Sequence, residues 1–211
     1  VLSGPTFARE VAVGLPTAMT VAATVREFAD DLAKRISDGT FRAYTSDDLT
    51  GVEVGGAVKN VLAIAAGISD GLGYGANARI ALINRGLIEM TRLGVALGAR
   101  AETFMGLAGM GDLVLTCTDN QSRNRRMGLG LAAGRSTEEV AGEIGQVVEG
   151  VYAARAVQQV AERAEVEMPI CALVGRILYE NLDPAEAVQL LMRRALRPEH
   201  EPHQAPPSKP V

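Results

Sequence analysis

The sequence is poor in aromatic residues and in cysteine. Phe, Trp and Tyr make up 4% of the 211 residues, and Trp is absent, so the core must be built from Ala, Val, Leu, Ile and Met. A core of such residues favours closely packed helices over a β-sandwich. The two cysteines, Cys117 and Cys171, are too few for a disulfide framework. We therefore expect a reducing, cytoplasmic environment.

Histidine is missing from most of the chain. Both histidines, His200 and His203, lie in the Pro-rich segment HEPHQAPPSKPV, whose composition is typical of disorder. This placement argues against a Ser-His-Asp triad and against a histidine metal site, so no metal is expected. Acid–base chemistry, if the protein performs it, has to come from Lys, Asp or Glu.

An excess of positive charge and a long hydrophobic run are also missing. The net charge of −4 argues against a general nucleic-acid-binding protein. No apolar run reaches ~18 residues without polar groups, so we expect no membrane span, and we find no signal peptide. The remaining composition, 47% hydrophobic and 22% charged, is ordinary for one or two globular domains.

The first 46 residues alternate short strands with helices. PTAMTVAA and FRAYTS predict strands, whereas FAREVAVG and REFADDLAKRIS predict helices. Such alternation is typical of an α/β sheet. The strands are too few for a complete sheet, so we predict the end of a larger one.

From Asp47 onward the strand pattern stops, and we predict an all-helical domain of six or seven helices over 47–197, followed by a disordered tail over 198–211. Asp47 or Asp48 would cap a helix running to about Ile68. Later helices start at a capping box, Ser136-x-x-Glu139, at a proline and at an aspartate. Over 77–98 we expect one buried face formed by Ile80, Ile83, Leu87, Met90 and Leu97.

A single lysine interrupts the apolar stretch GVEVGGAVKNVLAIAAGI. On a helix, Lys59 would lean over Gly55 and Gly56, where a small molecule could approach the bare backbone. Removing the ammonium from water favours its neutral form, which makes the lysine usable as an acid or a base. The alternative is a lysine that reaches water from a helix end, with the glycines serving helix–helix contact. The pattern alone leaves both open.

A second polar cluster lies in GLAGMGDLVLTCTDNQSRNRRMG. A glycine-rich turn precedes Asp112, and Ser122, Arg123 and Asn124 stand where a helix is predicted to begin. Free amides, a hydroxyl and a guanidinium at a helix N-terminus suit a phosphate group. Arg126 would share a face with Arg123. The alternative is a capped helix with solvated arginines, but a local Arg cluster in an acidic chain favours an anion pocket.

The segment GLGYGA, residues 71–76, fits the dinucleotide-binding pattern G-x-G-x-x-A. That pattern needs a strand before it and a βαβ unit around it. Helices are predicted on both sides, so we interpret it as a turn.

Together these segments resemble the bacterial type of NAD(P)-dependent glycerol-3-phosphate dehydrogenase. The resemblance covers about residues 1–195 and rests on six blocks in the family's order. They are SGPTFA, GGAVKN, GLGYGANAR, GLAGMGDLVLTCT, QSRNRRMG and GQVVEG. It implies a helical substrate domain like the C-terminal domain of 6-phosphogluconate dehydrogenase, behind the last strands and helices of a Rossmann domain.

The resemblance also implies roles for individual residues. Lys59 would be the catalytic proton donor, and NAD(P) the cofactor. The implied substrate contacts are Gly4, Thr6, Lys59, Asp112, Ser122, Arg123 and Asn124. The implied cofactor contacts are Ala8, Arg123, Val147 and Glu149. The substrate pair would be dihydroxyacetone phosphate and sn-glycerol 3-phosphate, used for phospholipid synthesis, and the expected assembly is a homodimer.

The family's glycine fingerprint and a further substrate-contacting lysine are not found in this sequence. By the family's pattern, Val1 falls late in the nucleotide domain, so we expect a fragment that holds at most half of the active site and is inactive alone. Two alternatives stay open at this point. One is a related β-hydroxy acid dehydrogenase, and the other is a non-catalytic helical module for phosphate binding or dimerisation.

Overall fold

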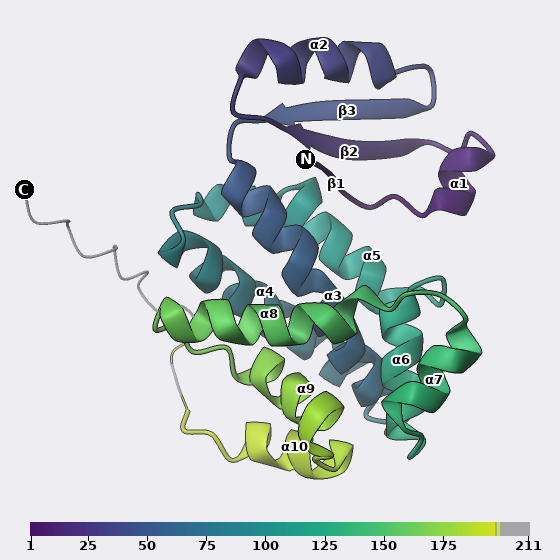
Figure 1. Ribbon diagram of the computed structural model, residues 1–211, viewed down its shortest axis with the longest axis vertical. Helices are drawn as coiled ribbons and strands as arrows, with labels where there is room; N and C mark the ends of the chain where they lie inside the picture. The colour runs from purple at the N-terminus through teal and green to yellow at the C-terminus, as the bar shows by residue number, and fades with distance from the viewer. Residues whose placement is uncertain (197, 199–211) are drawn as a thin grey trace, which may run out of the picture.

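A computed structural model describes residues 1–196 and 198, and most of the tail for which disorder is predicted lies outside them. The chain begins with a small sheet and two helices: β1 (Leu2–Ser3), α1 (Ala8–Ala12), β2 (Thr17–Ala22), α2 (Arg26–Ile36) and β3 (Phe41–Ser46). The strand order is β1-β2-β3, with β1 antiparallel to β2 and β3 parallel to β2. Figure 1 shows this unit at one end of the molecule, above the helical part.

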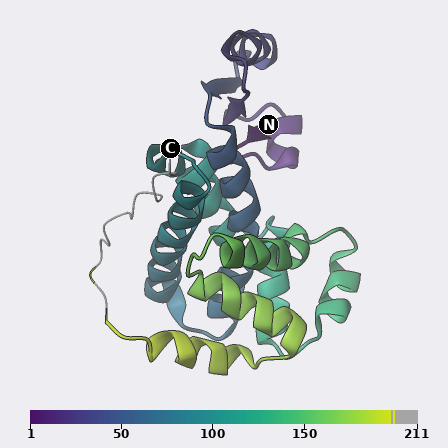
Figure 2. The ribbon, with the colours of Figure 1, turned by 60° about the vertical axis from the view of Figure 1, so that its left-hand side comes forward.

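The unit β2-α2-β3 has its own small core. Ala29 and Ala33 on α2 are buried against Val21 of β2, which is why the apolar side of this amphipathic helix faces the sheet. A second small cluster joins Ala22 of β2 to Val52 and Ala108 of the helical part. This second cluster fixes the sheet on the helices, and Figure 2 shows the sheet above the helical part from another side.

The helical part follows from Leu49. Its elements are α3 (Leu49–Gly71), α4 (Gly75–Ala96), a 3₁₀ helix (Ala101–Met105), a π-helical turn (Leu107–Gly111), α5 (Asp112–Thr118), α6 (Arg123–Ala132), α7 (Thr137–Ile144), α8 (Glu149–Arg163), α9 (Pro169–Glu180) and α10 (Pro184–Met192). The predicted fold class, mainly helical behind a short mixed sheet, is confirmed. The predicted number of helices, six or seven, was too low, because the described residues after Ser46 form eight α-helices.

Helix α3 is the centre of the helical part and packs against α4, α5, α6, α8 and α9. By length and composition it could cross a membrane, but 72% of its most apolar window is buried inside the protein. Its apolar character is therefore that of a core helix.

The predicted helix starts are confirmed where a local side chain defines them. Asp48, not Asp47, caps α3 by accepting a hydrogen bond from the Gly51 amide at 3.0 Å. Ser136 and Glu139 form the capping box of α7. Pro169 is the first residue of α9, and Asp183 caps α10.

The expected buried face of α4 is only partly right. Ile83 and Met90 belong to the main core, but Ile80 is 58% exposed and Leu97 lies just past the end of the helix. Most residues in the first two turns of α4 are exposed, so helical spacing alone overstates the buried stripe. The interpretation of GLGYGA as a turn is confirmed, since α3 ends at Gly71 and α4 begins at Gly75.

Helices α3 and α6 cross in direct backbone contact. A Cβ atom on Gly128 would overlap the Ile64 carbonyl oxygen and lie 2.7 Å from the Ile68 amide nitrogen. A Cβ atom on Gly67 would likewise overlap the carbonyl oxygen of Arg125. Only glycine allows this approach, which holds the first turn of α6 beside the middle of α3.

A buried carboxylate ties α4 to α9. Glu89 accepts hydrogen bonds from the amides of Ile170, at 2.8 Å, and Cys171, at 3.3 Å, in the first turn of α9. Burial raises the pKa of Glu89 to about 7, although these two hydrogen bonds act in the opposite direction. The native state therefore binds a proton more tightly than the unfolded chain does.

We predict that this carboxyl makes the fold more stable in mild acid. Its stabilising contribution is complete below the unfolded-state pKa of 4.5 and is lost as the pH rises through about 7. Compared with Glu89→Gln, the wild-type protein should gain about 2–3 kcal/mol of unfolding free energy at pH 5 relative to pH 8. Urea unfolding of both proteins at the two pH values measures this difference, and equal slopes with pH would contradict it.

Candidate active site

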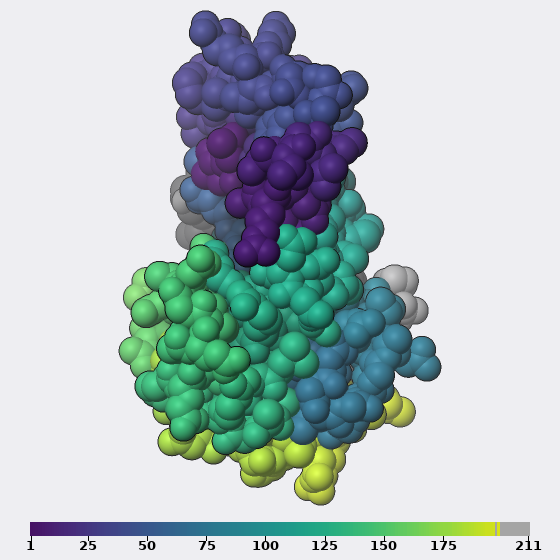
Figure 3. All heavy atoms as spheres, turned by 90° about the vertical axis from the view of Figure 1, so that its right-hand side faces the viewer, coloured from purple at the N-terminus to yellow at the C-terminus, as the bar shows by residue number. Residues whose placement is uncertain are grey.

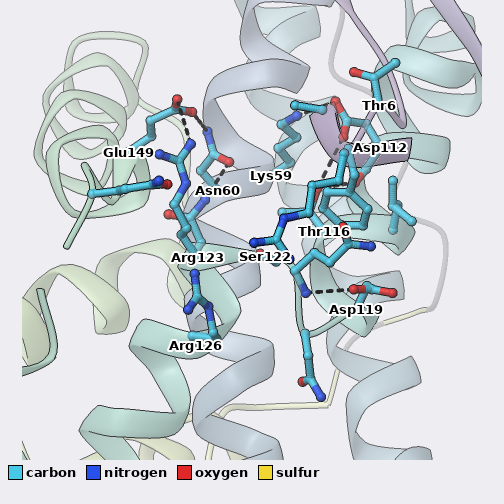
Figure 4. Close-up of a pocket in the computed structure, with 18 of the residues that line it drawn as sticks. Thr6, Lys59, Asn60, Asp112, Thr116, Asp119, Ser122, Arg123, Arg126 and Glu149 are labelled. Carbon is cyan, nitrogen blue, oxygen red and sulfur yellow. Dashed lines mark hydrogen bonds and ion pairs between the residues drawn. The ribbon is translucent and has the colours of Figure 1, made fainter. Parts of the chain in front are cut away.

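A cleft of about 880 Å³ lies where the N-terminal segment meets α3, α5 and α6. Its walls come from the segment after β1, the middle of α3, the loop between α5 and α6, and the start of α8. Figure 3 shows the N-terminal segment, in purple, seated directly above the teal surface of α5 and α6. The cleft thus joins residues from widely separated parts of the sequence, and Figure 4 shows them in close-up.

The lysine of the apolar stretch points into this cleft and pairs with a buried carboxylate. Lys59 Nζ donates a hydrogen bond to Asp112 Oδ2 at the start of α5. The side chains are 19% and 3% exposed, so the carboxylate is the more deeply buried partner. Asp112 Oδ1 in turn accepts from Thr116 Oγ1 at 3.2 Å. Because an ammonium has three N–H donors, two remain for a ligand.

The two glycines before Lys59 have different roles. A Cβ atom on Gly55 would overlap the Ala108 carbonyl oxygen, so this glycine serves close packing against the π-helical turn. Gly56 has room, since its Cβ would lie 3.5 Å from Ser3 Oγ. The helix-contact interpretation is therefore right for Gly55, but Lys59 lies in the middle of α3 and does not reach water from its end.

A chain of amides joins α3, α6 and α8 beside Lys59. Asn124 Nδ2 donates to Asn60 Oδ1 at 2.8 Å, and Asn60 Nδ2 donates to Glu149 Oε2 at 3.1 Å. Asn124 Oδ1 accepts from the Gly150 amide at 2.8 Å. Each side-chain amide is thereby held in one orientation. This chain fixes the start of α8 relative to the lysine.

The start of α6 supplies the polar side of the cleft. Ser122 caps the helix, since its Oγ accepts from the Arg125 amide at 3.2 Å. Arg123 lies 3.7 Å from Glu149 Oε1, a distance typical of a loose ion pair. Arg126 is exposed on the same side and also lines the cleft. The helix start therefore combines free amide groups with two guanidinium groups, which suits an anion.

The N-terminal segment forms the opposite wall. Gly4 has a φ of +151°, and a Cβ there would lie 2.9 Å from Met19 Cα, so the chain can pass β2 only with glycine. Thr6 Oγ1 donates to the Gly4 carbonyl at 3.1 Å. Gln121 Nε2 donates to Glu10 Oε1 at 2.9 Å, which links the loop before α6 to α1.

Nearly all of the residues implied by the resemblance line this one cleft. They are Gly4, Thr6, Ala8, Lys59, Asp112, Ser122, Arg123, Asn124 and Glu149. Val147 is not among the residues that line it, and it is 61% exposed. The neighbouring residue Gln146 lies in the wall instead.

Sequence reasoning missed other residues of the cleft. Asn60 and Thr116 were not predicted as site residues. Each contacts the side chain of a predicted one: Asn60 that of Asn124, and Thr116 that of Asp112. Asn120 and Gln121 also line the cleft, and the polar run from Thr116 to Asn124 was the signal for them. The contacts of Asn60 and Gln121 could not be predicted from spacing, because their partners, Asn124 and Glu10, lie 64 and 111 residues away in the sequence.

Comparison with known proteins assigns the chain to a class. Residues 48–189 match the model of the family described as "NAD-dependent glycerol-3-phosphate dehydrogenase C-terminus". Glycerol-3-phosphate dehydrogenase [NAD(P)+] of Methylococcus capsulatus is 61% identical over 199 residues, which is 94% of this chain and 59% of the relative. The corresponding protein of Aeromonas salmonicida is 60% identical over 200 residues, 94% of this chain and 60% of the relative.

A solved structure agrees with these matches. The crystal structure of glycerol-3-phosphate dehydrogenase from Coxiella burnetii is 54% identical, with a TM-score of 0.90, over 92% of this chain and 60% of that chain. The chain therefore belongs to the glycerol-3-phosphate dehydrogenase family of oxidoreductases, in its bacterial type. It spans about three fifths of the length of these curated relatives.

Proposed function

We propose that this chain is the substrate-binding and proton-donating part of an enzyme that interconverts dihydroxyacetone phosphate and sn-glycerol 3-phosphate. The observation that carries the proposal is the Lys59–Asp112 pair, which faces a cleft whose other wall is the start of α6. A proton donor and an anion-binding helix start, side by side, are what reduction of a phosphorylated ketone requires.

Lys59 is proposed to act on the ketone oxygen. As the carbonyl carbon accepts a hydride, negative charge develops on the oxygen, and the ammonium stabilises that charge and gives up one proton. Asp112 holds the lysine in place through Oδ2, so the reacting proton starts from a fixed position. In the oxidative direction the neutral amine takes the proton back from the alcohol.

The α6 wall of the cleft is proposed to bind the rest of the substrate. Ser122, Arg123 and Asn124 bring a helix N-terminus and a guanidinium to the cleft, and both favour a phosphate group. Gly4 and Thr6 close the cleft from the other side. The bound substrate is thereby enclosed between the N-terminal segment and α6.

The chemistry of the cleft edge fits a nicotinamide cofactor. Ala8, Arg123 and Glu149 line this edge, and they offer a small side chain, a cation and a carboxylate to a polar, charged molecule. When bound, NAD(P)H supplies the hydride. The volume of about 880 Å³ is near the upper end of the usual range for ligand pockets, roughly 300–1,000 Å³, which leaves room for more than a triose phosphate. Val147, beside this edge, is kept as a proposed cofactor contact.

The proposal extends to the organisation of the protein. Residues 1–46 would be the last part of a dinucleotide-binding domain and 47–197 the helical substrate domain, with the enzyme acting as a cytoplasmic homodimer in phospholipid synthesis. The cysteines agree with a reducing compartment, since both thiols are free and buried, and burial raises the pKa of each.

The test is reduction of dihydroxyacetone phosphate, measured for this chain alone and for the chain joined to a complete dinucleotide-binding domain. We expect NAD(P)H-dependent turnover only in the joined protein. Turnover of an unphosphorylated β-hydroxy acid instead would favour the related dehydrogenases. A well-folded joined protein that binds phosphate esters without any turnover would favour the non-catalytic binding module.

A further inference from the structure

A buried ionic cluster lies beside the cleft and has no part in the proposed chemistry. Asp70, near the end of α3, receives a guanidinium on each carboxylate oxygen: Arg79 Nη1 on Oδ1 at 2.8 Å and Arg125 Nη2 on Oδ2 at 2.6 Å. The Arg125 side chain is only 10% exposed, unlike Arg123 and Arg126 of the same helix turn. The cluster of Asp70, Arg79 and Arg125 carries one surplus positive charge.

Stability alone is a poor reason for burying Arg125. Its Nε atom, like that of Arg79, is buried without a hydrogen-bond partner. Removing a charged group from water and leaving a donor unpaired costs free energy that a single carboxylate offsets only in part. A buried arginine held in this way needs a further role.

The remaining contact of Arg125 indicates that role. Its Nη1 donates to Asn120 Oδ1 in the loop between α5 and α6, and Asn120 lines the cleft. A guanidinium can only donate, so the Asn120 amide must turn its oxygen toward Arg125 and its Nδ2 group away from it. Asn120 is exposed, and within the part of the chain that the structure describes its Nδ2 group makes no hydrogen bond to the protein.

We propose that Asp70 and Arg125 position Asn120, whose Nδ2 group binds the phosphate of the substrate. This inference rests on the proposed function and adds a binding residue and two positioning residues to it. Asp70 fixes the guanidinium, the guanidinium fixes the amide oxygen, and the amide presents its two N–H donors to the cleft. Such a donor loses little entropy on binding, because its orientation is set before the ligand arrives.

The test is a double-mutant binding cycle on the joined enzyme, titrated with sn-glycerol 3-phosphate and, separately, with inorganic phosphate. Asn120→Ala should weaken both dissociation constants about tenfold, the effect of one hydrogen bond to a charged group. Arg125→Lys keeps a cation beside Asp70 but cannot also reach Asn120, so it should weaken binding by a similar factor. Thr118→Ala, an exposed hydroxyl bonded within its own helix, is the matched control.

The double variant decides whether Arg125 acts through Asn120. If it does, Arg125→Lys in the Asn120→Ala background changes the dissociation constant no further. The inference would be overturned, while the proposed function stands, if the fold-changes in dissociation constant of the two single variants multiply in the double variant. An unchanged dissociation constant in Asn120→Ala would overturn it as well. A well-folded joined enzyme that binds no phosphate ester would overturn both. In the joined enzyme, Asn120→Ala should raise KM for dihydroxyacetone phosphate about tenfold and leave kcat within about twofold.

Discussion

Replacing Lys59 with alanine is expected to lower kcat for dihydroxyacetone phosphate reduction by about a thousandfold or more in the joined enzyme. Substrate affinity should change far less, because the α6 wall of the cleft keeps its groups. The physical reason is that the variant loses the only ammonium that faces the cleft among the described residues, and with it the proton for the developing alkoxide.

Two controls separate this loss from damage to the fold. Lys34→Ala removes an exposed lysine on α2 and should leave turnover unchanged. Urea unfolding of Lys59→Ala is needed because the variant leaves Asp112 buried without its partner. Steady-state kinetics and substrate titration give kcat and affinity separately, and near-normal turnover in a folded Lys59→Ala protein would exclude Lys59 as the proton donor.

The second large effect is expected at the crossing of α3 and α6. Gly128→Ala should destabilise the fold by about 3 kcal/mol or more, because the new methyl group would overlap the backbone of α3 at Ile64. Any structure that accommodates it must move α6 away from α3. That movement would shift the Ser122–Asn124 turn relative to Lys59, so binding of sn-glycerol 3-phosphate should weaken as well.

Gly142→Ala is the matched control, since Gly142 also lies inside a helix but has nothing within 4 Å of its Cβ position. There alanine should be neutral or should stabilise the protein by up to about 1 kcal/mol through helix propensity. Chemical denaturation of both variants measures the contrast. Equal stabilities for the two would show that the helices do not depend on this backbone contact.

The sequence predicted those features of the fold that depend on near neighbours. The starts of α3, α7 and α10 followed from Asp48, Ser136 and Asp183, since a cap is made within one turn of its helix. The exposure of Ile80 was not predicted, because periodicity shows which residues share a face but not how far the neighbouring helices extend along it.

The candidate site shows the same limit. The lysine and the polar helix start were visible as unusual residues in apolar surroundings, but their relation was not. Asp112 is 53 residues from Lys59, so no spacing rule joins them. Arg125 was overlooked for a similar reason: its carboxylate partner, Asp70, is 55 residues away on α3.

The distances along the chain between cleft residues also bear on how the protein folds. Asn60 contacts Glu149 across 89 residues, and Gln121 contacts Glu10 across 111. Contacts between residues so far apart in the sequence form late, after the intervening loops have been closed. The cleft then exists only in molecules that have completed folding, and a ligand held there opposes global unfolding by RT ln(1 + [L]/Kd). The amplitude of the ligand-shifted thermal transition would therefore give the fraction of fully assembled molecules in a preparation, including preparations that have no turnover.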